Sequence, residues 1–221
     1  MGHPDPRRDE GIEVRSDRPK GVFVTGTDTS VGKTLVSAWL ARNWGADYWK
    51  PIQTGATEDS DSATVERLAP GIAIHPPAVV LQAPLSPHEA ARREHVRIDL
   101  SALTPPRTDQ PLVVEGAGGV MVPINELALM IDLMARLQLP AVVVARSGLG
   151  TINHTLMTLE MLRRRHVPVL GVVMNGQRNP ANRQAIEHFG GTLVLAEIQP
   201  LLAVTESVLA SLPPPGFPCP G

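Results

Sequence analysis

The stretch VTGTDTSVGKT, at residues 24–34, has the order of glycine, lysine and threonine that is typical of a phosphate-binding loop. It follows the strand-like run GVFVTG and precedes the helical pattern KTLVSAWLARNW, which is the context that the motif requires. The usual loop has four residues before the Gly-Lys pair, whereas the longer segment Thr27 to Val31 separates Gly26 from Gly32. The extra residue widens the loop without removing its N–H donors, so we predict a nucleotide site. The alternative is an ordinary Gly-containing turn.

Two residues of the loop have side chains with a predicted role in chemistry. Lys33 is expected to reach the β- and γ-phosphates, and the Thr34 hydroxyl is expected to bind Mg²⁺. The loop N–H groups and the start of the helix supply further positive potential for an anion. The predicted nucleotide contacts in the loop are Thr29, Ser30, Val31, Gly32, Lys33 and Thr34.

Magnesium in this chemistry usually needs a carboxylate in addition to the threonine hydroxyl. Glu115 ends the predicted strand PLVVE, at the same sheet edge as the phosphate loop. Asp61, in EDSDSATVERLA, is the second candidate. Each has a structural alternative, because Glu115 could hydrogen-bond a turn and Asp61 could cap a helix.

The elements that must position these residues follow an alternating pattern of Val-rich runs and helical segments. Besides GVFVTG, the expected strands are ADYWKPIQ, PLVVEG, PAVVVARS and VPVLGVVMN. Further helices are expected over LALMIDLMARLQ and TINHTLMTLEMLRRR. This pattern predicts an α/β fold with a predominantly parallel β-sheet flanked by helices, in which ligands bind beyond the carboxyl ends of the strands. Residues 99–110, DLSALTPPRTDQ, are broken by proline where a crossover helix would be expected.

Length and composition limit the possible classes. A chain of 221 residues suggests one domain, which we place at residues 21–212 between an unstructured arm, 1–20, and a Pro-rich tail, 213–221. The net charge of −2 gives no reason to expect a nucleic-acid partner. No apolar run is long enough for a membrane span, and the N-terminus lacks the apolar core of a secretory signal. With Cys219 as its one cysteine, the chain is expected to be cytoplasmic.

Six motifs together resemble the dethiobiotin synthases and occur in the order found in that family. They are VTGTDTSVGKT, KPIQTG, SPHEAA, VEGAGG, GLGTINHTL and VVMNG, and they extend over residues 21–200. The widened phosphate loop is this family's own variant of the motif. The resemblance implies a P-loop NTPase-like fold and a homodimer with a shared active site.

The resemblance also implies a reaction, in which MgATP drives the closure of the ureido ring of dethiobiotin. The other substrates are 7,8-diaminononanoate and CO₂. A carbamate forms on one amine, ATP converts it to a carbamic–phosphoric anhydride, and the second amine then closes the ring. Two anions must be brought together, which requires concentrated positive charge.

Matching positions carry the family's functional residues onto this sequence. Lys50 would face the carbamate and γ-phosphate with Lys33 as the second catalytic lysine, and Thr54 would supply a hydroxyl to the substrate pocket. The metal positions are Thr34, Asp61 and Glu115. Asn175 would read adenine, with Pro200 beside it. In the partner subunit, the substrate carboxylate would meet Gly150, Thr151 and Asn153, with Thr151 or Asn153 capping the helix.

Two other functions share parts of this pattern. A nucleotide-dependent switch related to partitioning ATPases would carry a signature lysine five positions before Lys33, where this chain has Asp28. A glutaminase-coupled amidoligase would need a nucleophilic cysteine, and Cys219 lies in the Pro-rich tail. The sequence departs from the family at Ser30, where some members have an acid, and in the shortened segment 99–110.

Overall fold

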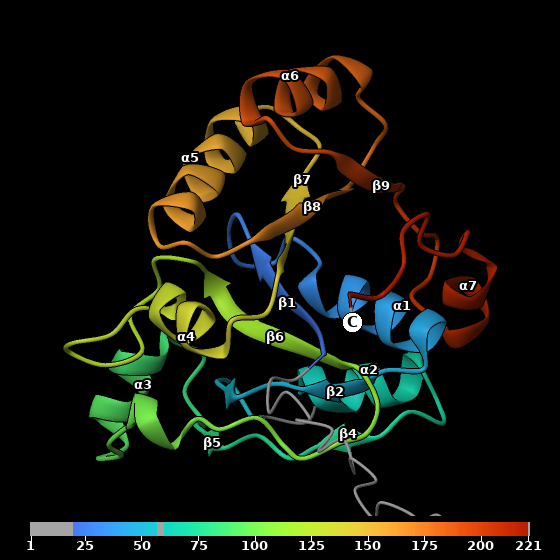
Figure 1. Cartoon of the computed structure of the whole chain (residues 1–221). Coiled ribbons are helices and arrows are strands. Elements are labelled where there is room, and N and C mark those ends of the chain that lie inside the picture. The colour runs from blue at the N-terminus through green and yellow to red at the C-terminus, as the bar shows by residue number, and fades with distance from the viewer. Residues whose placement is uncertain (1–19, 57–59, 221) are drawn as a thin grey trace, which may run out of the picture.

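The computed structural model describes residues 20–56 and 60–220, so the N-terminal arm predicted from the sequence lies almost wholly outside the described residues. A seven-stranded parallel sheet forms the centre of the molecule, with the strand order β4-β2-β6-β1-β7-β8-β9 (Figure 1). The strands are β1 (Gly21–Gly26), β2 (Asp47–Trp49), β4 (Ile74–His75), β6 (Leu112–Gly119), β7 (Ala141–Arg146), β8 (Val169–Asn175) and β9 (Val194–Ile198). The predicted fold class is confirmed.

Helices cover both faces of this sheet (Figure 1). One face is packed by α1 (Lys33–Trp44), α2 (Asp61–Leu68) and α7 (Glu206–Ser211). The other is packed by α3 (Pro87–Arg93), α4 (Met130–Leu137), α5 (Thr151–Arg164) and α6 (Pro180–Gly190).

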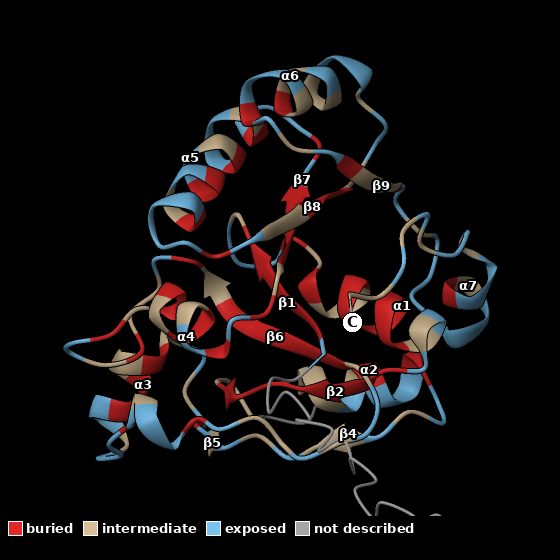
Figure 2. Cartoon of the chain, viewed as in Figure 1, coloured by how far each residue is buried: buried red, intermediate tan, exposed pale blue. Residues whose placement is uncertain are grey.

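Strand β7 shows why the Val-rich runs are nearly continuous. Val142 and Val144 join the core under α1, while Ala141, Val143 and Ala145 join the core under α4 and α5. Successive strand residues point to opposite faces, so a strand covered on both sides needs an apolar residue at every position. Figure 2 shows the resulting buried sheet between more exposed helices.

The order in which strands are added to the sheet changes direction at β1, which lies between β6 and β7. The first strands are added on the β6 side, and β7 to β9 follow on the other side. Such a switch point leaves a crevice at the carboxyl ends of the central strands. The phosphate loop, which follows β1 directly, lies at this edge.

Two predicted strand boundaries were wrong. The run ADYWKPIQ is divided at Lys50–Pro51, because β2 pairs in the main sheet whereas β3 (Ile52–Gln53) pairs with β5 (Val79–Val80) in a separate two-stranded sheet. Proline has no N–H to donate to a ladder, which accounts for a break at this position. Strand β6 continues through the glycines to Gly119, so Glu115 lies inside the strand and not at its end.

The segment 99–110 contains only the 3₁₀ turn η1 (Leu100–Ala102), so the expected lack of a crossover helix there is confirmed. The segment is fastened to the sheet edge near its end. The Thr108 hydroxyl donates to Asp47 Oδ2 over 2.6 Å, and His75 Nε2 lies 2.9 Å from the same oxygen.

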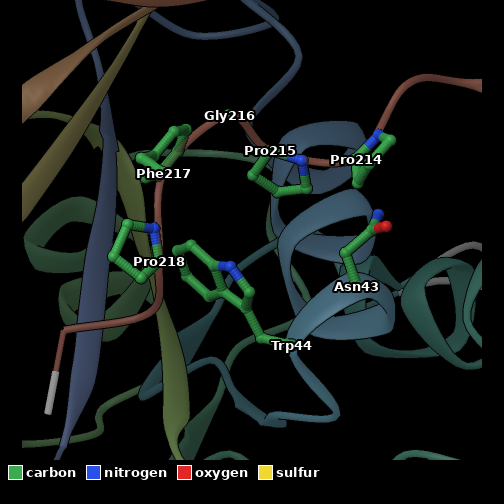
Figure 3. A pocket seen from close by; sticks show the side chains of 7 residues that line it. All are labelled: Asn43, Trp44, Pro214, Pro215, Gly216, Phe217 and Pro218. Atoms are coloured by element: carbon green, nitrogen blue, oxygen red, sulfur yellow. The ribbon is translucent and has the colours of Figure 1, made fainter.

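The Pro-rich tail folds back on the C-terminal end of α1. Trp39 Nε1 donates to the Pro213 carbonyl over 3.0 Å, and the Phe217 ring meets the edge of Trp44 with centroids 5.6 Å apart. Figure 3 shows the prolines and Trp44 around an open hollow of about 470 Å³. At 1.5 Å per residue, this end of α1 is roughly 16 Å from Lys33, so the hollow is separate from the phosphate loop. The division into domain and tail at residue 212 stays a prediction.

Within residues 20–56 and 60–220, none of the helices has the length and apolar character needed to cross a membrane.

Candidate active site

The phosphate loop connects β1 to α1 and depends on a glycine at its last position. Gly32 has a φ of 99°, which is the left-handed region that disfavours side chains. A Cβ there would also lie 2.1 Å from Asn175 Nδ2. Only glycine fits between the loop and the end of β8.

Lys33 begins α1 and is buried, with 7 % of its surface exposed. Its Nζ donates to the Asp28 carbonyl over 3.1 Å, so the side chain folds back across the loop. Burial lowers the pKa of Lys33 from its ordinary value; Glu115 opposes this, and Lys50 adds to the lowering.

A hydroxyl and two carboxylates converge next to the loop. Thr34 Oγ1 lies 2.6 Å from Asp61 Oδ1 and 3.0 Å from Glu115 Oε1. Thr34 comes from the first turn of α1, Asp61 from the first turn of α2, and Glu115 from β6 beside Val24 of β1. The predicted metal residues are thus brought together from positions up to 81 residues apart in the chain.

Lys50 joins this cluster from the break after β2. Its Nζ lies 2.7 Å from Asp61 Oδ2 and 3.1 Å from Glu115 Oε1, and the residue is only 4 % exposed. Burial alone would lower the pKa of Lys50, but Glu115 and Asp61 outweigh it and hold this pKa above its ordinary value. Burial likewise acts to raise the pKa of Asp61, and Lys50 turns the net shift downward. Both groups are therefore charged at neutral pH.

The helix-cap alternative for Asp61 was wrong. Ser60 is the N-cap of α2, and its side chain accepts a hydrogen bond from the Ala63 N–H. Asp61 is the next residue, and its side chain contacts Thr34 and Lys50. The turn alternative for Glu115 fails too, because its carboxylate contacts side chains of α1 and β2 and the Lys50 that follows β2.

The donor set fits a magnesium ion. Thr34, Asp61 and Glu115 offer hard oxygen atoms, and both carboxylates lie within hydrogen-bond distance of the Thr34 hydroxyl. Magnesium prefers a few carboxylate oxygens and keeps its remaining positions for water and phosphate. The Thr34 position directly after the loop lysine places this set beside the expected phosphates.

Sequence reasoning missed two residues that hold the carboxylates. The Tyr48 hydroxyl donates to Glu115 Oε2 over 3.0 Å, and Gln53 Nε2 lies 3.3 Å from Asp61 Oδ2. Burial, followed by the Glu115 charge, raises the pKa of Tyr48 well above its ordinary value. Both residues lie in the predicted strand ADYWKPIQ; the amide of Gln53 was an available signal, whereas Tyr48 is a common residue in strands and gave none.

Arg146 is a third residue that the sequence did not single out. It ends β7, and its guanidinium donates to the Thr29 carbonyl over 3.0 Å and lies 3.4 Å from Asp28 Oδ2. Asp28 Oδ1 also accepts the Thr29 N–H over 2.7 Å. A charged residue at the end of a buried Val-rich strand would have been the signal.

Asn175 lies against the phosphate loop, at the end of β8. Its Nδ2 donates to the Val31 carbonyl over 2.9 Å. This contact shapes the loop and does not test adenine recognition, which stays a prediction. Pro200 is exposed after β9, and its predicted role beside adenine is likewise untested. Thr54 contacts Gln53 through its backbone, because its carbonyl accepts a hydrogen bond from Gln53 Nε2 over 2.8 Å.

The start of α5 differs from the prediction in its cap. Gly150, with a φ of 88°, is the N-cap, and no side chain makes the cap hydrogen bond. The Thr151 side chain is buried and donates to the Arg146 carbonyl, and its N–H donates to the Gly148 carbonyl over 3.2 Å. Asn153 is exposed. The structure therefore leaves Asn153, and not Thr151, with a side chain available to a ligand.

Known proteins resemble the chain over most of its length. Residues 20–208 match the AAA domain family. The chain is 80 % identical over 202 residues to the ATP-dependent dethiobiotin synthetase BioD of Paramagnetospirillum magneticum, which covers 91 % of this chain and 98 % of that protein. It is 47 % identical to the protein of the same name from Afipia carboxidovorans, over 85 % of this chain and 91 % of that one.

A solved structure, the ParA family ATPase of Chlorobium tepidum, shares the fold with a TM-score of 0.51. At 11 % identity it covers 87 % of this chain and 92 % of that one. This likeness concerns the fold alone and carries no argument about activity.

Proposed function

The chain belongs to the ATP-dependent dethiobiotin synthetases, and from that premise we propose how its site closes the ureido ring. The substrates are 7,8-diaminononanoate, CO₂ and ATP. The observation that carries the proposal is the position of Lys50, a buried ammonium that bridges Asp61 and Glu115 beside Thr34 of the phosphate loop. The two carboxylates offset the Lys50 charge, so the positive charge that two meeting anions require would come from Lys33, Lys50 and a Mg²⁺ ion held by those carboxylates.

The reaction has three steps. One amine adds to CO₂ and loses a proton to give the carbamate. A carbamate oxygen attacks the γ-phosphorus, and the bond to the β-phosphate oxygen breaks to release ADP. The second amine then attacks the carbonyl carbon of the anhydride, loses a proton, and inorganic phosphate leaves with the bridging oxygen.

The two lysines act on different groups during these reaction steps. Lys33 folds back across the loop to the Asp28 carbonyl, which supports a role for its charge at the β- and γ-phosphates. Lys50 offsets the repulsion between the carbamate and the γ-phosphate. Water screens charges less in a buried site than at the surface. The attraction between each lysine and the reacting anions is therefore stronger here.

Thr34, Asp61 and Glu115 would hold Mg²⁺. When bound, the ion would neutralise charge on the phosphate oxygens during phosphoryl transfer. Tyr48 contacts Glu115 and Gln53 contacts Asp61, and these contacts would orient the two carboxylates for the ion.

We further propose that the active site is shared in a homodimer, with Asn153 of each protomer serving its partner. The support is the exposure of Asn153 at the start of a helix, where an anion is favoured. Among the described residues, Asn153 makes no hydrogen bond or ion pair with the lysine cluster of its own chain. A cytoplasmic location stays a prediction.

The switch function is less well supported. Its signature lysine would stand at Asp28, and here that carboxylate pairs with Arg146 of the same chain. An acid at this position cannot neutralise a partner's phosphates.

A mass-spectrometric assay tests the proposal directly. The purified chain is incubated with 7,8-diaminononanoate, ¹³C-bicarbonate and MgATP, with Lys50→Ala as the control. We expect dethiobiotin carrying one ¹³C atom from the wild type and none above background from the variant. ATP hydrolysis by the wild type without a labelled ring would contradict the proposed function.

A further inference from the structure

We propose that Tyr48 is a positioning residue, which fixes Glu115 so that one carboxylate oxygen faces Thr34 and the cation. This inference deepens the proposed function and rests on it. The two carboxylate oxygens of Glu115 contact different partners. Oε1 contacts Thr34 and Lys50, whereas Oε2 accepts from the Tyr48 hydroxyl over 3.0 Å.

The sheet register explains why Tyr48 reaches this carboxylate. Tyr48 of β2 is paired with Val113 of β6, and Glu115 lies two residues further along the same strand. Residues two apart on a strand share a face, so the Glu115 side chain emerges on the face that Val113 occupies. Tyr48 and Val113 belong to the core beneath α1 and α2, and the length of the phenol spans the remaining step to Glu115.

Burial makes this contact consequential. Tyr48 has no exposed surface and Glu115 has 1 %, so water cannot replace a lost hydrogen bond at Oε2. A buried carboxylate oxygen without a donor is costly, and the group rotates to find one. Rotation would carry Oε1 away from Thr34. The hydroxyl of Tyr48 thus acts on the metal through the orientation of Glu115 and not by touching it.

Asp61 has a weaker counterpart. Gln53 Nε2 approaches Asp61 Oδ2 at 3.3 Å and leaves Oδ1 to Thr34. Lys50 also contacts Oδ2, over 2.7 Å. If the Gln53 contact is lost, Lys50 still holds this oxygen, whereas no second donor is seen at Glu115 Oε2 among the described residues. A smaller effect is therefore expected for Gln53→Met than for Tyr48→Phe.

The test compares Tyr48→Phe with Ser37→Ala on the full chain. Tyr48→Phe removes one buried hydroxyl and keeps the ring. Ser37 also has a fully buried hydroxyl, which has no hydrogen-bond partner among the described residues and therefore orients none of the metal ligands. Two quantities are measured: the Mg²⁺ concentration that gives half-maximal turnover, and Mn²⁺ binding by electron paramagnetic resonance with a non-hydrolysable ATP analogue. Melting temperature reports stability separately.

We expect Tyr48→Phe to weaken both cation measures by about tenfold, as for other groups that orient metal ligands, with near-normal turnover at saturating Mg²⁺. Ser37→Ala should leave both unchanged. If Tyr48→Phe lowers the melting temperature but leaves the cation measures at wild-type values, Tyr48 is only a core residue and the inference is wrong. A wild type that makes the product without any divalent cation would overturn the inference too, and would remove the magnesium part of the proposed function.

Discussion

The cluster around Thr34 and the loop before α5 are built in opposite ways. In the cluster, α1, α2, β6 and the residue after β2 each contribute a side chain, and the charged groups satisfy one another in buried surroundings. The loop before α5 contributes mainly carbonyl groups: Thr151 donates to the Arg146 carbonyl and Asn182 of α6 donates to the Ser147 carbonyl. Leu149 in this loop and Asn153 at the start of α5 are exposed. The first region is complete within one chain. The second has its polar side chain facing outward, which is what a group that serves another molecule requires.

Loss of the loop lysine should have the largest effect on the complete region. Lys33→Ala removes a charge whose contact with the phosphates strengthens as phosphoryl transfer proceeds. We expect turnover to fall on the order of a hundredfold or more, as for other preorganised electrostatic donors. Lys20→Ala, at an exposed lysine before β1, is the matched control and should behave as wild type. Near-normal turnover in Lys33→Ala would refute the assignment of the phosphate loop.

Removing one cluster carboxylate should change the need for metal. Asp61→Asn keeps the side-chain shape but loses a charge, so we expect the Mg²⁺ concentration for half-maximal turnover to rise at least about tenfold. Ser60→Ala is the matched control because it removes the actual cap of α2. It should cost about 1 kcal/mol of unfolding free energy and leave the metal requirement unchanged. If a metal titration shows a wild-type Mg²⁺ requirement for Asp61→Asn, Asp61 is a structural residue and not a metal ligand.

In the outward-facing region, a charge should act on one substrate alone. Asn153→Asp puts a negative charge where the substrate carboxylate is proposed to bind, so the KM for the diamine should rise about tenfold. The KM for ATP should stay the same, because the phosphate loop is elsewhere. Steady-state kinetics with each substrate varied in turn measure both, and Asn153→Ser, which adds no charge, is the control. An equal rise in both KM values would show a general disturbance instead.

The Pro-rich tail should have the smallest effect on chemistry. It contacts α1 at Trp39 and Trp44, far from Lys33, so deletion after Leu212 should lower the melting temperature by a few degrees and leave turnover within about twofold. Phe217→Ala should reproduce part of the loss, since it removes only the ring contact. Thermal denaturation and the activity assay together decide this. A large fall in turnover at unchanged stability would mean that the tail takes part in the site.

How far the sequence predicts the site depends on how local each signal is. The phosphate loop and α1 follow from a continuous motif, and α1 occupies the predicted run Lys33–Trp44. Glu115, Asp61 and Lys50 are separated in the chain, so only the parallel sheet order and the family resemblance bring them together beforehand. Their distances could not be predicted.

Other features depend on tertiary packing with no local pattern. Tyr48 is an apolar-looking strand residue until the β2–β6 register places it beside Glu115. The break at Pro51 separates β3 from β2, although the run ADYWKPIQ has a continuous strand-like composition. Helix α6 and strand β9 were absent from the prediction; the sequence of α6, PANRQAIEHFG, mixes polar and apolar residues, and β9 is short, with the sequence VLAEI.

Complementation between two impaired variants tests most directly whether one region serves its own chain and the other serves the partner. Lys50→Ala disables the cluster, and Asn153→Asp weakens diamine binding, so activity is measured at a diamine concentration well below the wild-type KM, where both variants alone have low activity. In a mixed dimer with a shared site, one site carries both defects and the other carries neither. Random exchange makes roughly half of the dimers mixed, so activity should return to near a quarter of wild type. If subunit exchange is verified and no activity returns, both regions act within one chain and the shared site is wrong.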